Sequence, residues 1–108
     1  MNNIKNINKY LKSAKHIRTI NDLKRFLKDY FKGTDVKIYL FGSRARGDNS
    51  IYSDIDLAVK SDEDIKEKIS LLTEILEESY LPYKVDIVDL KNNSYLEEIV
   101  KKEGIRWI

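Results

Sequence analysis

Two aspartates, Asp54 and Asp56, are separated by one residue inside an otherwise apolar segment. The residues that alternate with them are those of a strand with one face in a core, namely Ile55, Leu57 and Val59. Because side chains alternate along a strand, both carboxylates leave from one face, with Cα atoms roughly 6–7 Å apart. Two ionised carboxylates beside a core are costly unless they meet a cation. The segment therefore predicts a strand over residues 54–60 that carries a metal site.

A Gly-Ser pair precedes these aspartates, with ten residues between Ser43 and Asp54. Gly42 allows a phosphate to approach the backbone, and Ser43 offers a hydroxyl and, if a short helix begins here, a backbone N–H at its positive end. Arg44 and Arg46 follow, and either can reach phosphate oxygens. The glycine spacing is also that of a P-loop, but the required Lys-Ser/Thr pair is missing. We therefore expect a phosphate-binding turn of another kind.

A later apolar segment, residues 84–90, carries an aspartate in the same setting. Asp86 lies between two apolar residues, as Asp56 does, and reaches the same metals if the two strands are neighbours. Asp89 competes with it, but the two have opposite parity, so one regular strand cannot turn both towards the site. We choose Asp86 because it is mid-strand, and we expect Asp89 to be a strand-end or loop residue.

Three carboxylates beside a phosphate-binding turn are what a metal-dependent nucleotidyltransferase requires. Mg²⁺ prefers carboxylate, water and phosphate oxygens. Two such ions about 3.5–4 Å apart stabilise the attacking and leaving oxygens of an in-line displacement at phosphorus. The pattern predicts two Mg²⁺ ions, with Asp54, Asp56 and Asp86 as metal ligands and catalytic residues.

Taken in order, these residues resemble the nucleotidyltransferase superfamily related to polymerase beta, and in particular the minimal nucleotidyltransferase (MNT) antitoxins of prokaryotic HEPN/MNT toxin–antitoxin pairs. The likeness spans roughly residues 20–104, and the segments that carry it are Phe41-Gly42-Ser43, Ala45-Arg46-Gly47, Ser53-Asp54-Ile55-Asp56-Leu57 and Val85-Asp86-Ile87-Val88. The resemblance implies that the Gly-Ser element holds the triphosphate. It also implies that the first two aspartates bind both metals, and that the third binds the catalytic metal and helps to activate the acceptor hydroxyl.

The same resemblance implies a substrate and a partner. It points to transfer of AMP from ATP to a tyrosine of a HEPN-type RNase toxin, with the chain acting as an antitoxin in a hetero-oligomer. Chain length agrees, because a catalytic sheet and its helices use nearly all of 108 residues and leave the acceptor site to a partner. Two alternatives stay open: a non-catalytic antitoxin that blocks its partner sterically, and a transferase acting on a small molecule or an RNA end.

Charge is uneven along the chain. Residues 1–32 hold nine Lys or Arg against two Asp, a balance of +7, so the rest carries −5 of the net +2. A basic segment can meet RNA or an acidic protein, but we favour a solvated helix surface as its explanation. Of the two kinds of partner, we expect a protein. The sequence has no cysteine, no apolar N-terminal run and no segment near the roughly 20 apolar residues of a membrane span, so we expect a cytoplasmic protein.

The expected fold is α/β (α+β): a small mixed sheet of three or four strands with helices mainly on one face, in a single domain. Residues 1–33 form a helical N-terminal part and residues 34–108 the catalytic core. We predict that Thr19, Ser61 and Ser94 cap three helices, the last through a capping box with Glu97, and that Gly33 and Gly104 end two. The remaining expected elements are a helix near residues 4–14, a strand over residues 36–41 and a short strand or apolar tail at residues 105–108.

Overall fold

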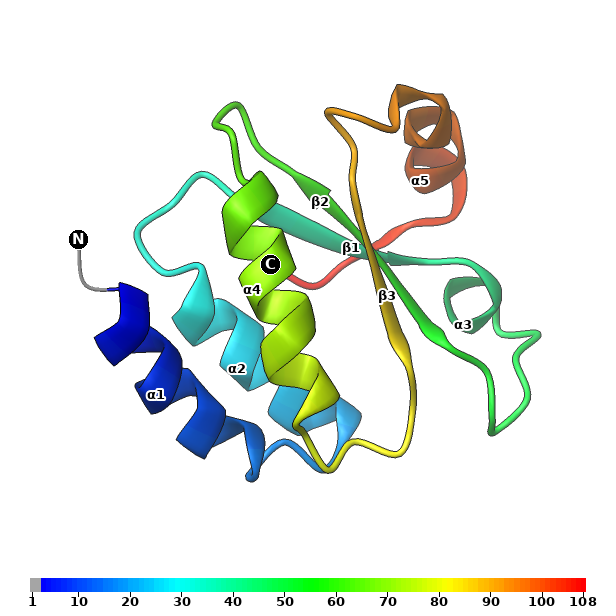
Figure 1. Cartoon of the computed structure of the whole chain (residues 1–108). Coiled ribbons are helices and arrows are strands. Elements are labelled where there is room, and N and C mark those ends of the chain that lie inside the picture. The colour runs from blue at the N-terminus through cyan, green and yellow to red at the C-terminus, as the bar shows by residue number, and fades with distance from the viewer. Residues whose placement is uncertain (1–2) are drawn as a thin grey trace.

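The computed structural model describes the backbone of residues 3–108 and the side chains from residue 8 onward (Figure 1). Two helices come first, after which strands and helices alternate. In chain order the elements are α1 (Asn3–Ala14), α2 (Ile20–Tyr30), β1 (Lys37–Phe41), α3 (Ser43–Arg46), β2 (Ile55–Lys60), α4 (Lys66–Glu77), β3 (Val85–Asp89), the 3-10 helix η1 (Ser94–Leu96), α5 (Glu97–Glu103) and β4 (Ile105–Arg106).

The four strands form one mixed sheet in the order β3-β2-β1-β4. β1 pairs antiparallel with β2 and with β4, whereas β2 and β3 are parallel. A parallel pair needs a crossover connection, and α4 supplies it between β2 and β3. The expected mixed sheet is therefore confirmed, and the last residues of the chain do add a strand.

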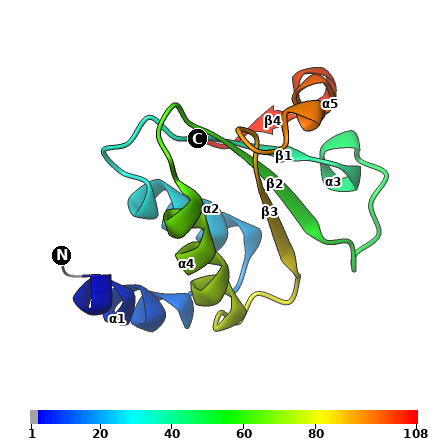
Figure 2. The same cartoon turned by 45° about the horizontal axis from the view of Figure 1, so that its top comes forward.

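Helices α1, α2 and α4 lie on one side of the sheet, and α5 lies on the other (Figure 2). The main core lies between the sheet and the first group of helices, and its fully buried side chains include Leu23 and Leu27 of α2, Ile55 and Leu57 of β2 and Leu72 of α4. A smaller cluster forms beneath α5 from Ala58, Leu90 and Val100. Because α5 covers only part of its face, the carboxylates of the sheet keep access to solvent.

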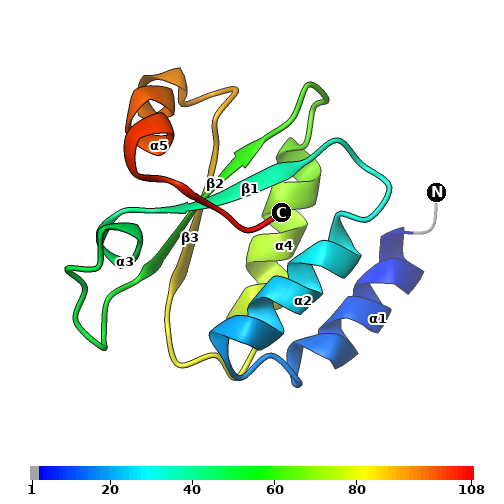
Figure 3. The same cartoon turned by 180° about the vertical axis from the view of Figure 1, so that it is seen from behind.

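The two N-terminal helices pack side by side and against α4, as the rear view shows (Figure 3). Tyr10 of α1 contacts both Phe26 and Tyr30 of α2 edge-on, with ring centroids 5.8 Å and 4.9 Å apart. Thr19 caps α2 as predicted: its side chain accepts a hydrogen bond from the Asp22 N–H, and the Asp22 carboxylate accepts one from the Thr19 N–H. The described part of the basic N-terminal segment thus packs onto the main core through side chains of α1 and α2.

Two predicted helix starts are wrong. Ser61 does not cap a helix, because α4 begins only at Lys66. The Ser61 hydroxyl and the Asp62 N–H instead donate to the Asp35 carboxylate, which joins this segment to the start of β1. Ser94 makes no capping box with Glu97, since it opens the 3-10 helix η1 and α5 begins at Glu97.

Of the two predicted helix ends, one is at the expected glycine and the other is earlier in the chain. Gly104 ends α5 as expected. α2 ends at Tyr30, and Gly33 lies in the turn that follows, with φ of +82°. Across the described part of the chain, no helix combines the length and the apolar character needed to cross a membrane.

Candidate functional site

Asp56 and Asp86 are register partners across the parallel pair of β2 and β3. Neighbouring strands lie about 4.8 Å apart, so the two carboxylates leave the sheet side by side on one face. The same register places Ile55 opposite Val85, on the other face. The two strands are therefore neighbours, as expected, and Asp86 lies on the same face of the sheet as Asp56.

The electrostatics of Asp56 show that a third carboxylate is close. Burial raises the pKa of the Asp56 carboxyl above its ordinary value, the charges of Asp86 and Asp54 raise that pKa further, and Arg46 lowers it. A nearby like charge makes a carboxyl group more costly to ionise. The three predicted aspartates therefore share one acidic region, with Arg46 as the nearby cation.

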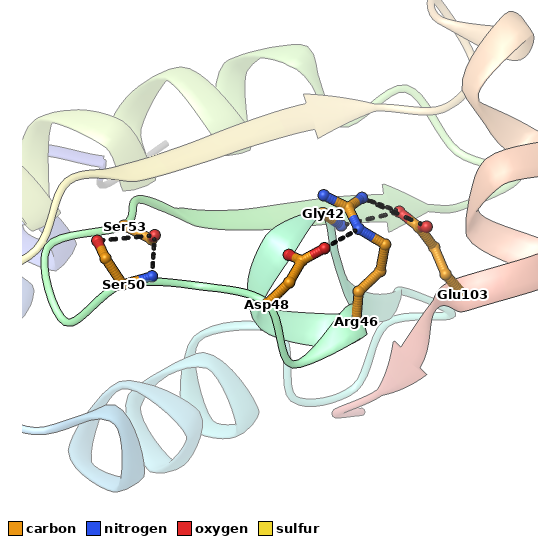
Figure 4. A network of polar contacts seen from close by, with 6 residues as sticks. All are labelled: Gly42, Arg46, Asp48, Ser50, Ser53 and Glu103. Carbon is orange, nitrogen blue, oxygen red and sulfur yellow. Dashed lines mark hydrogen bonds and ion pairs between the residues drawn. The ribbon is translucent and has the colours of Figure 1, made fainter.

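Asp54 lies just before β2, at the exit of a tight turn. Within that turn the Ser50 N–H donates to the Ser53 Oγ at 3.0 Å (Figure 4). The Ser53 N–H donates back to the Ser50 carbonyl at 3.2 Å. Arg44 holds the same turn from α3, because its Nε and Nη2 both donate to the Ser53 carbonyl, at 3.0 and 2.8 Å. Its guanidinium also lies 4.4 Å from the ring centroid of Tyr83. In this structure Arg44 thus positions the backbone next to Asp54.

Gly42 lies against Asp56 at the end of β1. Its backbone has φ of +77° and ψ of −157°, a region that is essentially restricted to glycine. A Cβ on Gly42 would lie 2.5 Å from the Oδ2 of Asp56. The glycine therefore brings the Gly-Ser turn directly against the acidic region, so a group bound at one must adjoin the other.

Ser43 begins the short helix α3, as the sequence suggested, and Gly42 is its N-cap. The helix ends after one turn, where Gly47 adopts a left-handed conformation and its N–H donates to the Ser43 carbonyl at 2.9 Å. Ser43, Arg44 and Arg46 thus lie on a single helical turn that starts beside Asp56.

Arg46 is held between two carboxylates. Its Nε donates to Asp48 at 3.0 Å, and its Nη1 contacts both oxygens of Glu103 at 3.2 and 3.4 Å (Figure 4). Glu103 also accepts a hydrogen bond from the Gly42 N–H at 3.2 Å. Sequence reasoning missed Glu103, because it belongs to no motif and lies 61 residues from Gly42. Only the pairing of β4 with β1 could have pointed to it.

Asp89 is the last residue of β3 and pairs with Val59, so strand alternation places it on the face opposite to Asp86. Its carboxylate accepts hydrogen bonds from the Lys91 N–H at 3.0 Å and from the Asn92 side chain at 3.2 Å. It is thus the strand-end residue that parity predicted.

An open groove of about 600 Å³ runs along the outer edge of β3, next to Asp86. Its walls include Glu77 and Thr73 of α4 and the loop residue Tyr83. The Asp86 carboxylate lies 3.5 Å from the Lys84 Nζ at this edge, and its side chain is 43% exposed. Asp86, at the edge of the acidic region, is therefore accessible to solvent.

The donor set fits a divalent cation. All three predicted ligands are carboxylates, which are ligands that Mg²⁺ prefers, and two of them raise the pKa of the third. Among the residues whose side chains are described, no three His, Cys, Asp or Glu are gathered closely enough to form a preformed metal cage. A bound cation would draw these carboxylates together by neutralising their repulsion.

Comparison with known proteins agrees with this geometry. Residues 21–106 match the family described as polymerase beta, nucleotidyltransferase. MJ1379 of Methanocaldococcus jannaschii, provisionally named a protein adenylyltransferase, is 36% identical over 86 residues, which cover 76% of this chain and 84% of that protein. The Haemophilus influenzae protein named "Probable protein adenylyltransferase MntA" is 39% identical over 70 residues, covering 63% of this chain and 61% of that protein.

Solved structures give the same picture. A toxin–antitoxin crystal structure with AMP-PNP superposes with a TM-score of 0.59 at 30% identity, covering 82% of this chain and 71% of that one. A mutant of the toxin–antitoxin pair MntA-HpeT superposes with a TM-score of 0.56 at 26% identity, covering 82% and 70%. The fold, the sequence match and the relatives agree, and the chain is an enzyme of the nucleotidyltransferase type that belongs to the polymerase beta nucleotidyltransferase family.

Proposed function

We propose that this chain transfers AMP from ATP to a tyrosine hydroxyl of a HEPN-type RNase toxin and thereby acts as its antitoxin. The observation that carries the proposal is the packing of Gly42 against Asp56, with Asp54 and Asp86 close to the same carboxylate. A triphosphate held by the Gly-Ser turn would then have its α-phosphorus near all three carboxylates.

The reaction needs one bond formed and one broken. The acceptor oxygen bonds to the α-phosphorus of ATP, the bond to the β-phosphate breaks, pyrophosphate leaves, and the hydroxyl proton passes to solvent. Two Mg²⁺ ions, held by Asp54, Asp56 and Asp86, would supply charge stabilisation and lower the pKa of the acceptor hydroxyl. The chain itself contributes the carboxylates, the N–H and hydroxyl groups of Ser43 and, as a further proposal, the cations Arg44 and Arg46.

The identity of the acceptor is supported by the relatives and by the accessible edge of the site. Relatives carry the name protein adenylyltransferase, and the similar solved structures are toxin–antitoxin complexes. The groove beside Asp86 is open to solvent, so a hydroxyl carried by another protein can approach there. Residues 34–108 supply every element of the proposed catalytic core, and residues 1–33 the N-terminal helical part.

The direct test is incubation of the purified chain with its helical partner protein, radiolabelled ATP and Mg²⁺. We expect one AMP on a partner tyrosine, seen as a mass increase and located by peptide sequencing. Asp86→Asn should abolish transfer while nucleotide binding remains, and the matched variant Asp89→Asn should transfer normally because that carboxylate faces away from the site.

Each contrary result has a definite meaning. If an RNA 3′ end gains label and the partner does not, the transferase chemistry stands and the acceptor is wrong. If the Asp54→Asn/Asp56→Asn double variant still neutralises the partner fully in cells, binding alone explains the biological role.

A further inference from the structure

Glu103 links the C-terminal part of the chain to the Gly-Ser turn. One of its oxygens accepts from the Gly42 N–H at 3.2 Å, and the same carboxylate contacts the guanidinium of Arg46 (Figure 4). The Glu103 side chain is 21% exposed, whereas that of Arg46 is 47% exposed. The carboxylate is thus the more sheltered partner of this ion pair, and it contacts both ends of α3.

Strand pairing places Glu103 in this position. β4 pairs with β1 so that Leu40 lies opposite Ile105. Glu103 is the last residue of α5, two residues before this pair, so the strand pairing brings the end of α5 beside the end of β1. From there the Glu103 carboxylate reaches the Gly42 N–H.

The residue after Glu103 fixes the direction of the chain. A Cβ on Gly104 would lie 2.4 Å from the Val100 carbonyl oxygen, and the Gly104 N–H donates to that oxygen at 2.8 Å. Only glycine allows α5 to turn into β4 this closely. Glu103 is consequently held at a rigid corner between the two elements.

We propose that Glu103 is a positioning residue for nucleotide binding, which holds the Gly-Ser turn and Arg46 in the arrangement that receives the triphosphate. The inference rests on the nucleotidyl-transfer function proposed above. The contacts of the Glu103 carboxylate in this structure are with the Gly42 N–H and with the Arg46 guanidinium. Glu103 acts through the Gly42 amide and through Arg46, whose charge also acts on Asp56.

Three variants separate positioning from general stability. Glu103→Ala removes both contacts, and Glu103→Gln keeps an oxygen for the Gly42 N–H but loses the charge that faces Arg46. Glu98→Ala is the matched control, because it removes an exposed carboxylate from the same helix. Because the chain has four glycines, the Gly42 amide signal can be assigned by NMR in each variant.

We expect Glu103→Ala to shift the Gly42 amide resonance and to raise the KM for ATP about tenfold, with kcat changed less than twofold, because binding by the turn acts before and during the reaction alike. Glu103→Gln should show an intermediate KM, and Glu98→Ala should match the wild type. Circular dichroism checks that each variant is folded, and calorimetric ATP affinity in Mg²⁺ repeats the comparison without turnover.

Unchanged ATP affinity in both Glu103 variants, with the Gly42 amide shifted, would overturn this inference alone. So would an equal loss in Glu98→Ala. A wild-type chain that binds no ATP in Mg²⁺ would overturn the proposed function and this inference together, so the two failures can be told apart.

Discussion

At Gly42, the backbone conformation and a neighbouring carboxylate together exclude a side chain. The sequence indicated this glycine, but for a different reason. A phosphate-binding role was readable from the Gly-Ser pattern, whereas the contact with Asp56 depends on how β1 and β2 pair, which no local pattern encodes.

We predict that Gly42→Ala displaces Asp56 and destabilises the fold by about 1–3 kcal/mol, the typical cost of a backbone region essentially restricted to glycine. Nucleotide binding in Mg²⁺ should fall at least tenfold. Gly33→Ala is the control, because it has a similar φ of +82° and open space around a Cβ. Thermal unfolding measures the loss of stability, and calorimetry measures the nucleotide affinity. Equal nucleotide affinity in the two variants would show that the displacement of Asp56 does not affect nucleotide binding.

Asp56→Asn should have opposite effects on stability and on function. Like charges next to one another on paired strands are destabilising, and relief of up to about 1 kcal/mol by the neutral amide should raise the melting temperature in EDTA at pH 7 by up to about 5 °C. Nucleotide binding in Mg²⁺ should be largely lost. A lower melting temperature in EDTA would show that the carboxylate stabilises the fold and that the repulsion argument is wrong.

Residue parity allowed the sequence to separate Asp86 from Asp89, because side-chain direction in a strand alternates without exception over short lengths. Glu103 could not be found in this way. Its role depends on a two-residue strand, β4, that pairs with β1 far along the chain.

At the scale of elements, the strand boundaries were predictable and two helix starts were not. Each expected strand in the sheet's centre differs from the observed one by no more than one residue at either end. Serine is a residue type favoured at helix N-caps, but the Ser61 hydroxyl donates to Asp35, a residue distant in sequence. The hydroxyl of Ser61 is used in this tertiary contact and does not cap a helix, and α4 begins at Lys66, later than expected.

This contact makes a prediction about pH. Hydrogen bonds from Ser61 and from the Asp62 N–H hold the pKa of Asp35 below its ordinary value of 3.8. A carboxyl whose pKa is lowered by folding stabilises the folded state above that ordinary value, and this stabilisation is lost as the pH falls through the folded pKa. Asp35→Ala should therefore lower the melting temperature at pH 7, and the difference from the wild type should shrink below about pH 4.

Asp62→Ala is the matched control for this prediction, because it removes an exposed carboxylate from the same segment and leaves the backbone N–H that Asp35 accepts. Parallel melting curves of the three proteins between pH 3 and 7 provide the comparison. A difference between wild type and Asp35→Ala that stays constant over this range would contradict the assignment.

For the whole molecule, we predict that divalent cations raise stability through the three carboxylates. An ion that binds the folded state but not the unfolded chain stabilises it by RT ln(1 + [L]/Kd), about 2.7 kcal/mol at one hundred times Kd. We expect Mg²⁺ or Mn²⁺ with ATP to raise the wild-type melting temperature. The Asp54→Asn/Asp56→Asn double variant should show no such rise. Equal ATP affinity with EDTA and with Mg²⁺ would contradict the metal site.

The sheet order also governs how the molecule folds. β1 and β2 are joined by residues 42–54, which include α3, whereas the contact of Gly42 with Glu103 closes a loop of 61 residues. Loop closure costs entropy before the contact repays it, so contacts distant in sequence slow folding. We therefore expect the Gly-Ser turn to be among the last parts of the protein to become fixed, and α5 with β4 to open more readily than the core beneath α2 and α4.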